Sequence, residues 1–354
     1  MIYYLVWFFV ALMAILGYSN KRYSKMAALM IILVVTLFCG LRFHDRWSDA
    51  EMYYSLFMNS GVADKDFEIG FKLLNKICRA ILVNYNVYLC AMYGLVLSLY
   101  YQEYRDAISI KYTPFCLFVF CSIMILSSGG FRQFIAGSIL FFSIRYIRKR
   151  DLKKFLLLIV IAFLFHRTSI CFVPMYWISQ YKLKFISFFK IALVGVACGS
   201  IGLFDYIIRF VLEHMDSFSS VMVRVKLYMS TTEQLNLFSF GNIKRTLIIL
   251  LFFFILKHKK EIIGGRNTLQ VYLNIYAVGY LLSFFVPGTF SRINVYFYLA
   301  EPVIESLAIM NVKKSKYRCL LFLGLIILNL SIWTNTLLTF YPELMFPYKT
   351  CIFS

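Results

Sequence analysis

Long apolar runs follow one another along almost the whole sequence, and they constrain the fold more than any single motif. Hydrophobic residues make up 61% of the 354 residues and charged residues only 15%, which gives far too much apolar surface for a soluble fold. An apolar run of about 17 to 25 residues can cross a bilayer as a helix. The sequence therefore predicts an all-α polytopic membrane protein that forms a single membrane domain over residues 1–354.

About ten full transmembrane helices are expected. They lie near residues 2–19, 26–41, 86–104, 112–129, 131–147, 186–204, 243–257, 268–286, 292–310 and 318–336. The first of them has no basic leading segment and no small-residue cleavage site, so it is expected to be a retained helix and not a signal peptide.

The run from 155 to 179 is harder to interpret, because His166, Arg167 and Pro174 interrupt it. Four basic clusters should lie on the cytoplasmic side by the positive-inside rule, at 21–25, 145–154, 257–266 and 313–318. All four do so only if the run from 155 to 179 enters the membrane and returns. We therefore predict a short helical hairpin that turns at His166, with both termini extracytoplasmic.

The formal net charge of +20 is explained by this topology, because basic side chains gather on the predicted inner surface. It therefore indicates orientation and attraction to anionic lipid, and no nucleic-acid partner is expected. Two outer loops are predicted, at 42–84 and 205–242. Within the first, Phe71, Leu74, Ile77 and Ile81 are expected to form the apolar stripe of a helix lying in the membrane interface.

Four polar islands lie on the predicted outer side. They are Arg42, Asp45, Asp49, Tyr53 and Glu68 in the first loop, Arg132 with Gln133, His166 with Arg167, and Arg292 after Pro287 and Gly288. Ordinary structural interpretations exist, because an arginine at a helix end commonly extends to the headgroups and a lone histidine is more often structural than catalytic. Ionisable residues inside apolar runs are nevertheless costly, so they indicate function. We predict that Arg132, His166 and Arg292 share one extracytoplasmic pocket.

Several common site motifs are missing from the sequence, namely HExxH, the P-loop, GxSxG and CxxC. Asp64-Lys65-Asp66 matches the DxD pattern of many glycosyltransferases, but nucleotide sugars are not expected on the outer side. The nine cysteines lie mostly in or beside apolar runs, where cysteine behaves as a small hydrophobic residue. We therefore expect no metal ion, no cofactor and no disulfide scaffold.

In their order and spacing, the polar islands resemble the EpsG family of Wzy-type polymerases, which build bacterial surface polysaccharides such as O-antigen, exopolysaccharide and capsule. The resemblance covers most of the chain and rests on five motifs. These are Gly40-Leu41-Arg42-Phe43 with Asp49 and Tyr53, then Glu68-Ile69-Gly70-Phe71, Arg132-Gln133 with Ala136, Ala162 with His166 and Ser169, and Arg292. The chain departs from the family pattern at Arg46-Trp47, where Val-Gly is usual before the loop aspartate.

The resemblance implies a membrane glycosyltransferase. It would transfer a growing glycan from polyprenyl diphosphate to the nonreducing end of another lipid-linked repeat unit, at the outer face of the bacterial cytoplasmic (inner) membrane. The implied partners are an undecaprenyl-diphosphate-linked oligosaccharide and membrane lipid, with a chain-length regulator and a flippase as candidate protein partners.

The predicted site residues suit this chemistry. Arg132 and Arg292 are expected to stabilise the departing diphosphate, because guanidinium groups form bidentate contacts with phosphate. His166 is expected to take the proton of the attacking hydroxyl, with Asp49 as the competing base and His214 as a minor one. The remaining residues are expected to bind substrate, and these are Arg42, Glu68, Gln133 and Tyr53. Arg42 and Glu68 would orient sugar hydroxyls or hold the first loop in place, and Tyr53 would stack on a sugar ring.

Other functions remain open from the sequence alone. An O-antigen-type ligase uses a similar donor, and a flippase or transporter of lipid-linked oligosaccharides also needs charged residues within a helical bundle. A lipid-phosphate sugar transferase and a membrane acyltransferase are further enzyme classes. A transporter is disfavoured, because the islands cluster on one side and no paired halves are detected.

Overall fold

The computed structural model describes residues 2–43, 49–58, 67–82, 84–124, 130–213, 239–259, 261–285, 293–339 and 346–351. Nearly all of these residues lie in helices or in the turns between them, apart from an isolated antiparallel bridge between Arg42 and Thr350. The predicted all-α fold is therefore confirmed for the described residues.

The helices follow one another in this order. The first half of the chain forms α1 (Ile2–Ser19), η1 (Lys21–Tyr23), α2 (Ser24–Gly40), α3 (Ala50–Met58), α4 (Ile69–Leu82), α5 (Tyr85–Ala107), η3 (Ile110–Tyr112), α6 (Thr113–Met124), α7 (Phe131–Arg148) and α8 (Leu152–Phe165). The second half forms η4 (Arg167–Phe172), α9 (Met175–Ile178), α10 (Phe185–Ser200), α11 (Leu203–Glu213), α13 (Phe240–His258), α14 (Arg266–Phe285), α15 (Val295–Tyr298), α16 (Glu301–Asn311) and α17 (Ser315–Thr339).

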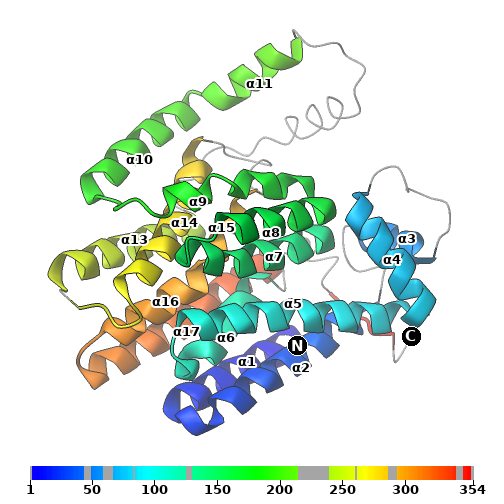
Figure 1. Cartoon of the computed structure of the whole chain (residues 1–354). Coiled ribbons are helices and arrows are strands. Elements are labelled where there is room, and N and C mark those ends of the chain that lie inside the picture. Colours follow the sequence, from blue (N-terminus) through cyan, green and yellow to red (C-terminus); the bar gives the residue numbers. More distant parts are fainter. Residues whose placement is uncertain are drawn as a thin grey trace.

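Helix α6 lies at the centre of the bundle and packs against α1, α2, α5, α16 and α17. All its side chains from Thr113 to Ser122 are buried, as expected of a helix that is apolar on every side. Helix α7 packs against α5 and α8, and α14 packs against α10, α13 and α16. In Figure 1 most of these helices run roughly side by side, while α3 and α4 lie at one end of the bundle.

Several helices have the length and apolar character of membrane spans. They are Ile2–Ser19, Lys21–Gly40, Arg266–Phe285 and Ser315–Thr339, and the pair α4 and α5, bent by 119°, would be a fifth. Outward-facing side chains such as Leu5 and Phe8, each 58% exposed, fit a lipid environment. The protein is thus a helical membrane protein. The number of crossings stays a prediction, since α6, α10 and α16 have only 12, 16 and 11 residues.

The chain reverses at His166, where the sequence predicts the turn of a hairpin. Helix α8 ends at Phe165, and His166 is extended, with φ −156° and ψ 115°. The returning chain packs on α8, with the rings of Phe155 and Tyr176 centred 5.4 Å apart. The returning arm differs from α8, because it consists of η4 and the short α9 and not of one regular helix.

The predicted crossing at 292–310 is interrupted. Helix α15 ends at Tyr298, a turn follows at Leu299 and Ala300, and α16 begins at Glu301. Pro302 lies in the first turn of α16, where its missing N–H costs no helical hydrogen bond, so it favours the start of a new helix at this point.

Helix α4 is amphipathic, but its apolar stripe differs from the predicted one. Its exposed large apolar residues are Ile69, Leu73, Ile77 and Ile81, which repeat every four positions. Phe71 is fully buried, because this face of α4 covers aromatic side chains of α3 and α7. The residues facing outward therefore include only half of the expected stripe.

Candidate functional site

Glu68 lies between Arg132 and His166, and these three side chains form the centre of the candidate site. Oε2 of Glu68 accepts a hydrogen bond from Nη1 of Arg132 at 2.6 Å, and Oε1 lies 3.4 Å from Nδ1 of His166. The backbone N–H of Arg167 donates to the same Oε1 at 3.3 Å. Three distant parts of the sequence thus meet at one carboxylate.

The position of Glu68 is set by the close approach of α4 to the end of α8. A Cβ atom on Gly70 would lie 2.7 Å from the carbonyl oxygen of Leu164, so a larger residue at this position would force the two helices apart. Because Leu164 precedes His166 by two residues, this contact brings Glu68 to the turn of the hairpin. The packing explains why a glycine follows Glu68 at this spacing.

Arg132 lies in the first turn of α7, and aromatic rings hold its guanidinium group. Its Cζ is 4.7 Å from the ring centre of Phe67 and 6.0 Å from that of Tyr53, which are cation–π distances. Its Nε is buried and has no hydrogen-bond partner among the described residues, while the side chain as a whole is partly exposed. The rings therefore fix the direction of the guanidinium group.

The ring of Tyr53 packs against the guanidinium group of Arg132. It is only 5% exposed and packs against Phe67 and Phe71. Burial raises the pKa of Tyr53, so the phenol stays neutral and is a poor candidate for a base. The buried ring thus holds Arg132 in place. The stacking of Tyr53 on a sugar ring stays a prediction.

The site is partly open. The side chains of Arg132 and His166 are 19% and 23% exposed, and that of Glu68 is 9% exposed. Burial raises the pKa of Glu68, but the contacts with His166 and Arg132 outweigh this effect and lower the pKa to about 2. Glu68 is therefore ionised at neutral pH and forms an ion pair with Arg132. The exposed part of the Arg132 side chain suits an anionic substrate group.

The other predicted site residues are placed as follows. Asp49 precedes α3, where its carbonyl oxygen accepts a hydrogen bond from the N–H of Tyr53 at 3.1 Å. Gln133 follows Arg132 on α7 and folds back toward Gly130, where an added Cβ would lie 3.3 Å from Oε1 of Gln133. Arg292 and Asp45 lie outside the described residues. The structure therefore brings Glu68, Arg132 and His166 together and leaves the roles of the others as predictions.

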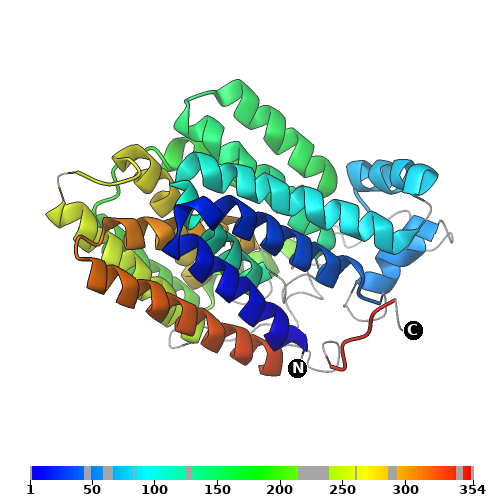
Figure 2. The same ribbon diagram turned by 90° about the horizontal axis from the view of Figure 1, so that it is seen from below.

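Arg42 lies in a different setting. It is 1% exposed, it donates a hydrogen bond to the hydroxyl of Tyr3, and its guanidinium group lies near the rings of Tyr3, Phe38 and Tyr348. Its backbone pairs with Thr350. These contacts join the residues after α2 to both ends of the described chain. Figure 2 shows the two chain ends at the same end of the bundle as α3 and α4. A role for Arg42 in substrate binding stays a prediction.

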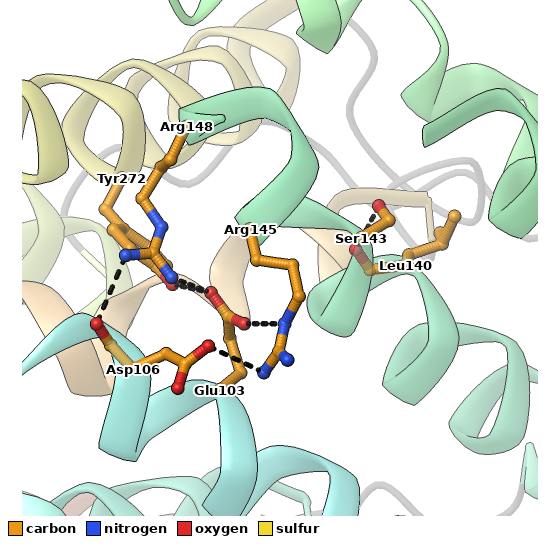
Figure 3. A network of polar contacts seen from close by, with 7 residues as sticks. All are labelled: Glu103, Asp106, Leu140, Ser143, Arg145, Arg148 and Tyr272. Carbon is orange, nitrogen blue, oxygen red and sulfur yellow. Dashed lines mark hydrogen bonds and ion pairs between the residues drawn. The ribbon is translucent and has the colours of Figure 1, made fainter. Parts of the chain in front are cut away.

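A second charged network lies at the opposite end of α7, and the sequence pattern did not predict it. Glu103 of α5 accepts hydrogen bonds from Nε of Arg145 at 2.9 Å, from Nη2 of Arg148 at 2.7 Å and from the hydroxyl of Tyr272 at 2.7 Å (Figure 3). Nη2 of Arg145 also lies 3.2 Å from Oδ2 of Asp106. Glu103 lies inside the predicted span at 86–104, and a carboxylate there needs a basic partner. This acidic residue was therefore the signal that could have indicated the network.

Among the residues with described positions, no three His, Cys, Asp or Glu side chains lie close enough together to hold a metal ion. The Asp64-Lys65-Asp66 motif and His214 fall outside these residues.

Comparison with known proteins gives one informative match. No curated protein and no solved structure matches the chain significantly. The model of the EpsG family matches residues 25–350, which is most of the sequence and includes every residue of the candidate site. The chain therefore belongs to the EpsG family.

Proposed function

We propose that this protein is an oligosaccharide repeat-unit polymerase of the bacterial inner membrane. It would transfer a glycan from polyprenyl diphosphate to the nonreducing end of another lipid-linked repeat unit, at a site facing outward. The observation that carries the proposal is the shared carboxylate of Glu68, which joins the cation Arg132 to the candidate base His166. Membership of the EpsG family supports a role of this polymerase type.

The reaction breaks the bond between the anomeric carbon and the diphosphate oxygen, and it forms a bond from that carbon to the acceptor oxygen. The diphosphate leaves with the electron pair, so negative charge develops on it in the transition state. Arg132 lies at the amino end of α7, where the helix dipole also favours negative charge, and its side chain is 19% exposed, so the guanidinium group can contact the leaving group. Arg292 is the predicted second cation.

The proton of the attacking hydroxyl goes to His166. Because Nδ1 faces Glu68, the other ring nitrogen, Nε2, is the atom that would accept it. The carboxylate orients the ring and stabilises the imidazolium that forms. Glu68 thus takes a positioning role instead of the sugar-binding role expected from the sequence. Asp49 stays the alternative base.

Product length on purified protein tests the reaction. The protein, reconstituted with lipid-linked repeat units alone, should give a ladder of longer glycans. Elongation that needs a different lipid acceptor would indicate a ligase, and movement of the lipid-linked sugar across the bilayer without lengthening would indicate a flippase. Either result would overturn the proposal.

His166→Ala tests the assignment of the base. Removal of a general base should lower the elongation rate by about 100- to 10,000-fold while the protein stays folded and inserted. Asp49→Asn is the matched variant, because it removes the competing base and leaves Glu68, Arg132 and His166 intact. If Asp49→Asn abolishes elongation and His166→Ala does not, Asp49 is the general base and His166 is not.

A further inference from the structure

A buried ionic cluster lies between α13, α14, α16 and α17, away from Glu68. Nζ of Lys244 lies 2.5 Å from Oε1 of Glu301 and 2.8 Å from Oε1 of Glu305, and it donates to Oδ1 of Asn329 at 3.1 Å. The hydroxyl of Tyr276 donates to Oε2 of Glu301 at 2.9 Å. Buried charges persist only with such partners, so the cluster fixes the rotation of α13 about its axis.

The next residue, Arg245, points to a different side of α13. Its Cζ lies 4.0 Å from the ring centre of Tyr298, and its Nη1 donates to Oδ1 of Asn242 at 3.2 Å. Its Nε is buried without a hydrogen-bond partner, and no carboxylate lies within ion-pair distance of it, in the part of the chain that the structure describes. The side chain as a whole is only half-buried. Lys244 is thus neutralised directly, whereas Arg245 keeps unused donors.

Helix α15 joins Arg245 to the first site. Tyr296 and Tyr298 are two residues apart, about 200° around a helix, so they face opposite sides of α15. The hydroxyl of Tyr296 lies 3.1 Å from Oγ1 of Thr168, next to His166 and Arg167, while Tyr298 lies beneath Arg245. The two basic sites therefore flank one short helix.

Helix α15 is held rigidly between the two sites. The hydroxyl of Tyr298 donates to the carbonyl oxygen of Gly279 at 3.2 Å. A Cβ on Gly279 would overlap the Cβ of Phe297, so α14 and α15 approach as closely as backbones allow. The separation of the two basic sites is thus set by packing.

We propose that Arg245, with Asn242 and Tyr298, is a second anion-binding subsite, which binds the diphosphate of the acceptor glycan lipid. This inference rests on the proposed function, since a reaction between two lipid-linked glycans involves two diphosphates. The first is the leaving group at Arg132. The second stays attached to the acceptor chain and needs its own cation. A guanidinium group stacked on a tyrosine with unused donors suits a phosphate oxygen.

Binding stoichiometry tests the subsite without requiring turnover. Undecaprenyl diphosphate is titrated into protein in phosphatidylcholine nanodiscs, and the bound equivalents are counted by native mass spectrometry. We expect two equivalents for the unmodified chain, one each for Arg245→Gln and Arg132→Gln, and none for the double variant. Lys257→Gln, at the exposed far end of α13, is the matched control and should bind two. If the Arg245→Gln protein binds two equivalents of undecaprenyl diphosphate with unchanged affinity, the inference is overturned.

A phospholipid headgroup offers similar phosphate chemistry, so a second arm separates the two sources. Nanodiscs that contain phosphatidylglycerol should still bind two equivalents of undecaprenyl diphosphate if the subsite is selective for the diphosphate. Loss of the Arg245-dependent equivalent in these nanodiscs would assign the site to a lipid headgroup and contradict the proposal.

Kinetics separate the subsite from the proposed reaction. Arg245→Gln should raise the KM for the acceptor by about 10- to 100-fold and leave kcat nearly unchanged, since it removes hydrogen bonds to a charged group far from the reacting atoms. If the protein makes no ladder but loses one equivalent with Arg245→Gln, the subsite stands and the polymerase proposal fails. If Arg245→Gln makes a normal ladder with an unchanged KM and stoichiometry, the polymerase proposal stands and the subsite fails.

Discussion

The two ends of α7 carry the same chemical groups in contrasting settings. At one end Arg132 pairs with Glu68, and at the other Arg145 and Arg148 pair with Glu103. Glu103 is 0% exposed, and both of its oxygens accept hydrogen bonds from neighbours (Figure 3). Glu68 lies beside Arg132 and His166, whose side chains are both partly exposed.

This difference shows how exposure separates stability from function. A buried network in which every charge has an oppositely charged partner holds α5, α7 and α14 together. A network that is partly open can admit a ligand at small cost to the fold. We therefore expect changes at Glu103 to affect stability and changes at Arg132 to affect turnover.

Glu103→Gln should produce the largest effect. It leaves Arg148 without an ion pair and Arg145 with Asp106 as its remaining charged partner, so the free energy of unfolding should fall by about 3–5 kcal/mol. Denaturant unfolding of the purified protein in detergent measures this change. Glu68→Gln is the matched variant at the other end of α7, and an equal loss of stability there would remove the contrast between the two networks.

Arg132→Gln should lower kcat by about 100- to 1000-fold, because it removes a preorganised donor from the leaving diphosphate. Arg145→Gln removes the same group from the other end of the helix. It should reduce the stability of the protein and leave the rate per folded molecule unchanged, as measured by elongation assays normalised to folded protein. Similar losses of kcat in both variants would contradict the assignment.

The pH dependence of stability gives a smaller signal from Glu68. Its pKa falls from 4.5 to about 2 on folding, so its contribution is complete above pH 4.5 and is lost as the pH falls toward 2. The stability difference between the unmodified chain and Glu68→Gln should therefore shrink over this interval. Thermal melts from pH 5.5 to 2.5 measure it, and a constant difference would show that the Glu68 contacts do not stabilise its ionised form.

The smallest effect is expected at the contact between Thr168 and Tyr296, which supports the open site from α15. Thr168→Val and Tyr296→Phe should each cost about 0.5–1.5 kcal/mol, the usual net value of one hydrogen bond. The double variant should cost less than the sum of the two single changes, because they remove the same bond. Strict additivity in unfolding measurements would show that the two hydroxyls do not interact.

The sequence predicted the features that depend on local pattern. The helical membrane architecture follows from the apolar runs, and the reversal at His166 follows from the charge distribution along the chain. The proximity of Arg132 and His166 was predicted from their shared side of the membrane. Arg292, the third member of that predicted pocket, lies outside the described residues, so its place stays a prediction.

Contacts that depend on distant pairing have no local signal in the sequence. The contacts of Arg42 with Tyr3 and Tyr348, at the two ends of the described chain, are of this kind, and its role in substrate binding stays a prediction. The network around Glu103 was not predicted, because its partners lie more than 40 residues away on α7. The break before α16 had a local signal in Pro302, but the surrounding apolar residues resembled one continuous span.

The pairing of Arg42 with Thr350 also bears on the order in which the protein matures. The N–H of Phe43 donates to the carbonyl oxygen of Lys349, and that of Cys351 donates to the carbonyl oxygen of Leu41. Residues 41–43, which follow α2, therefore acquire these partners only after residues 346–351 have left the ribosome. During synthesis the described helices are made before this pairing forms, so it is among the last backbone contacts of the described chain to become available.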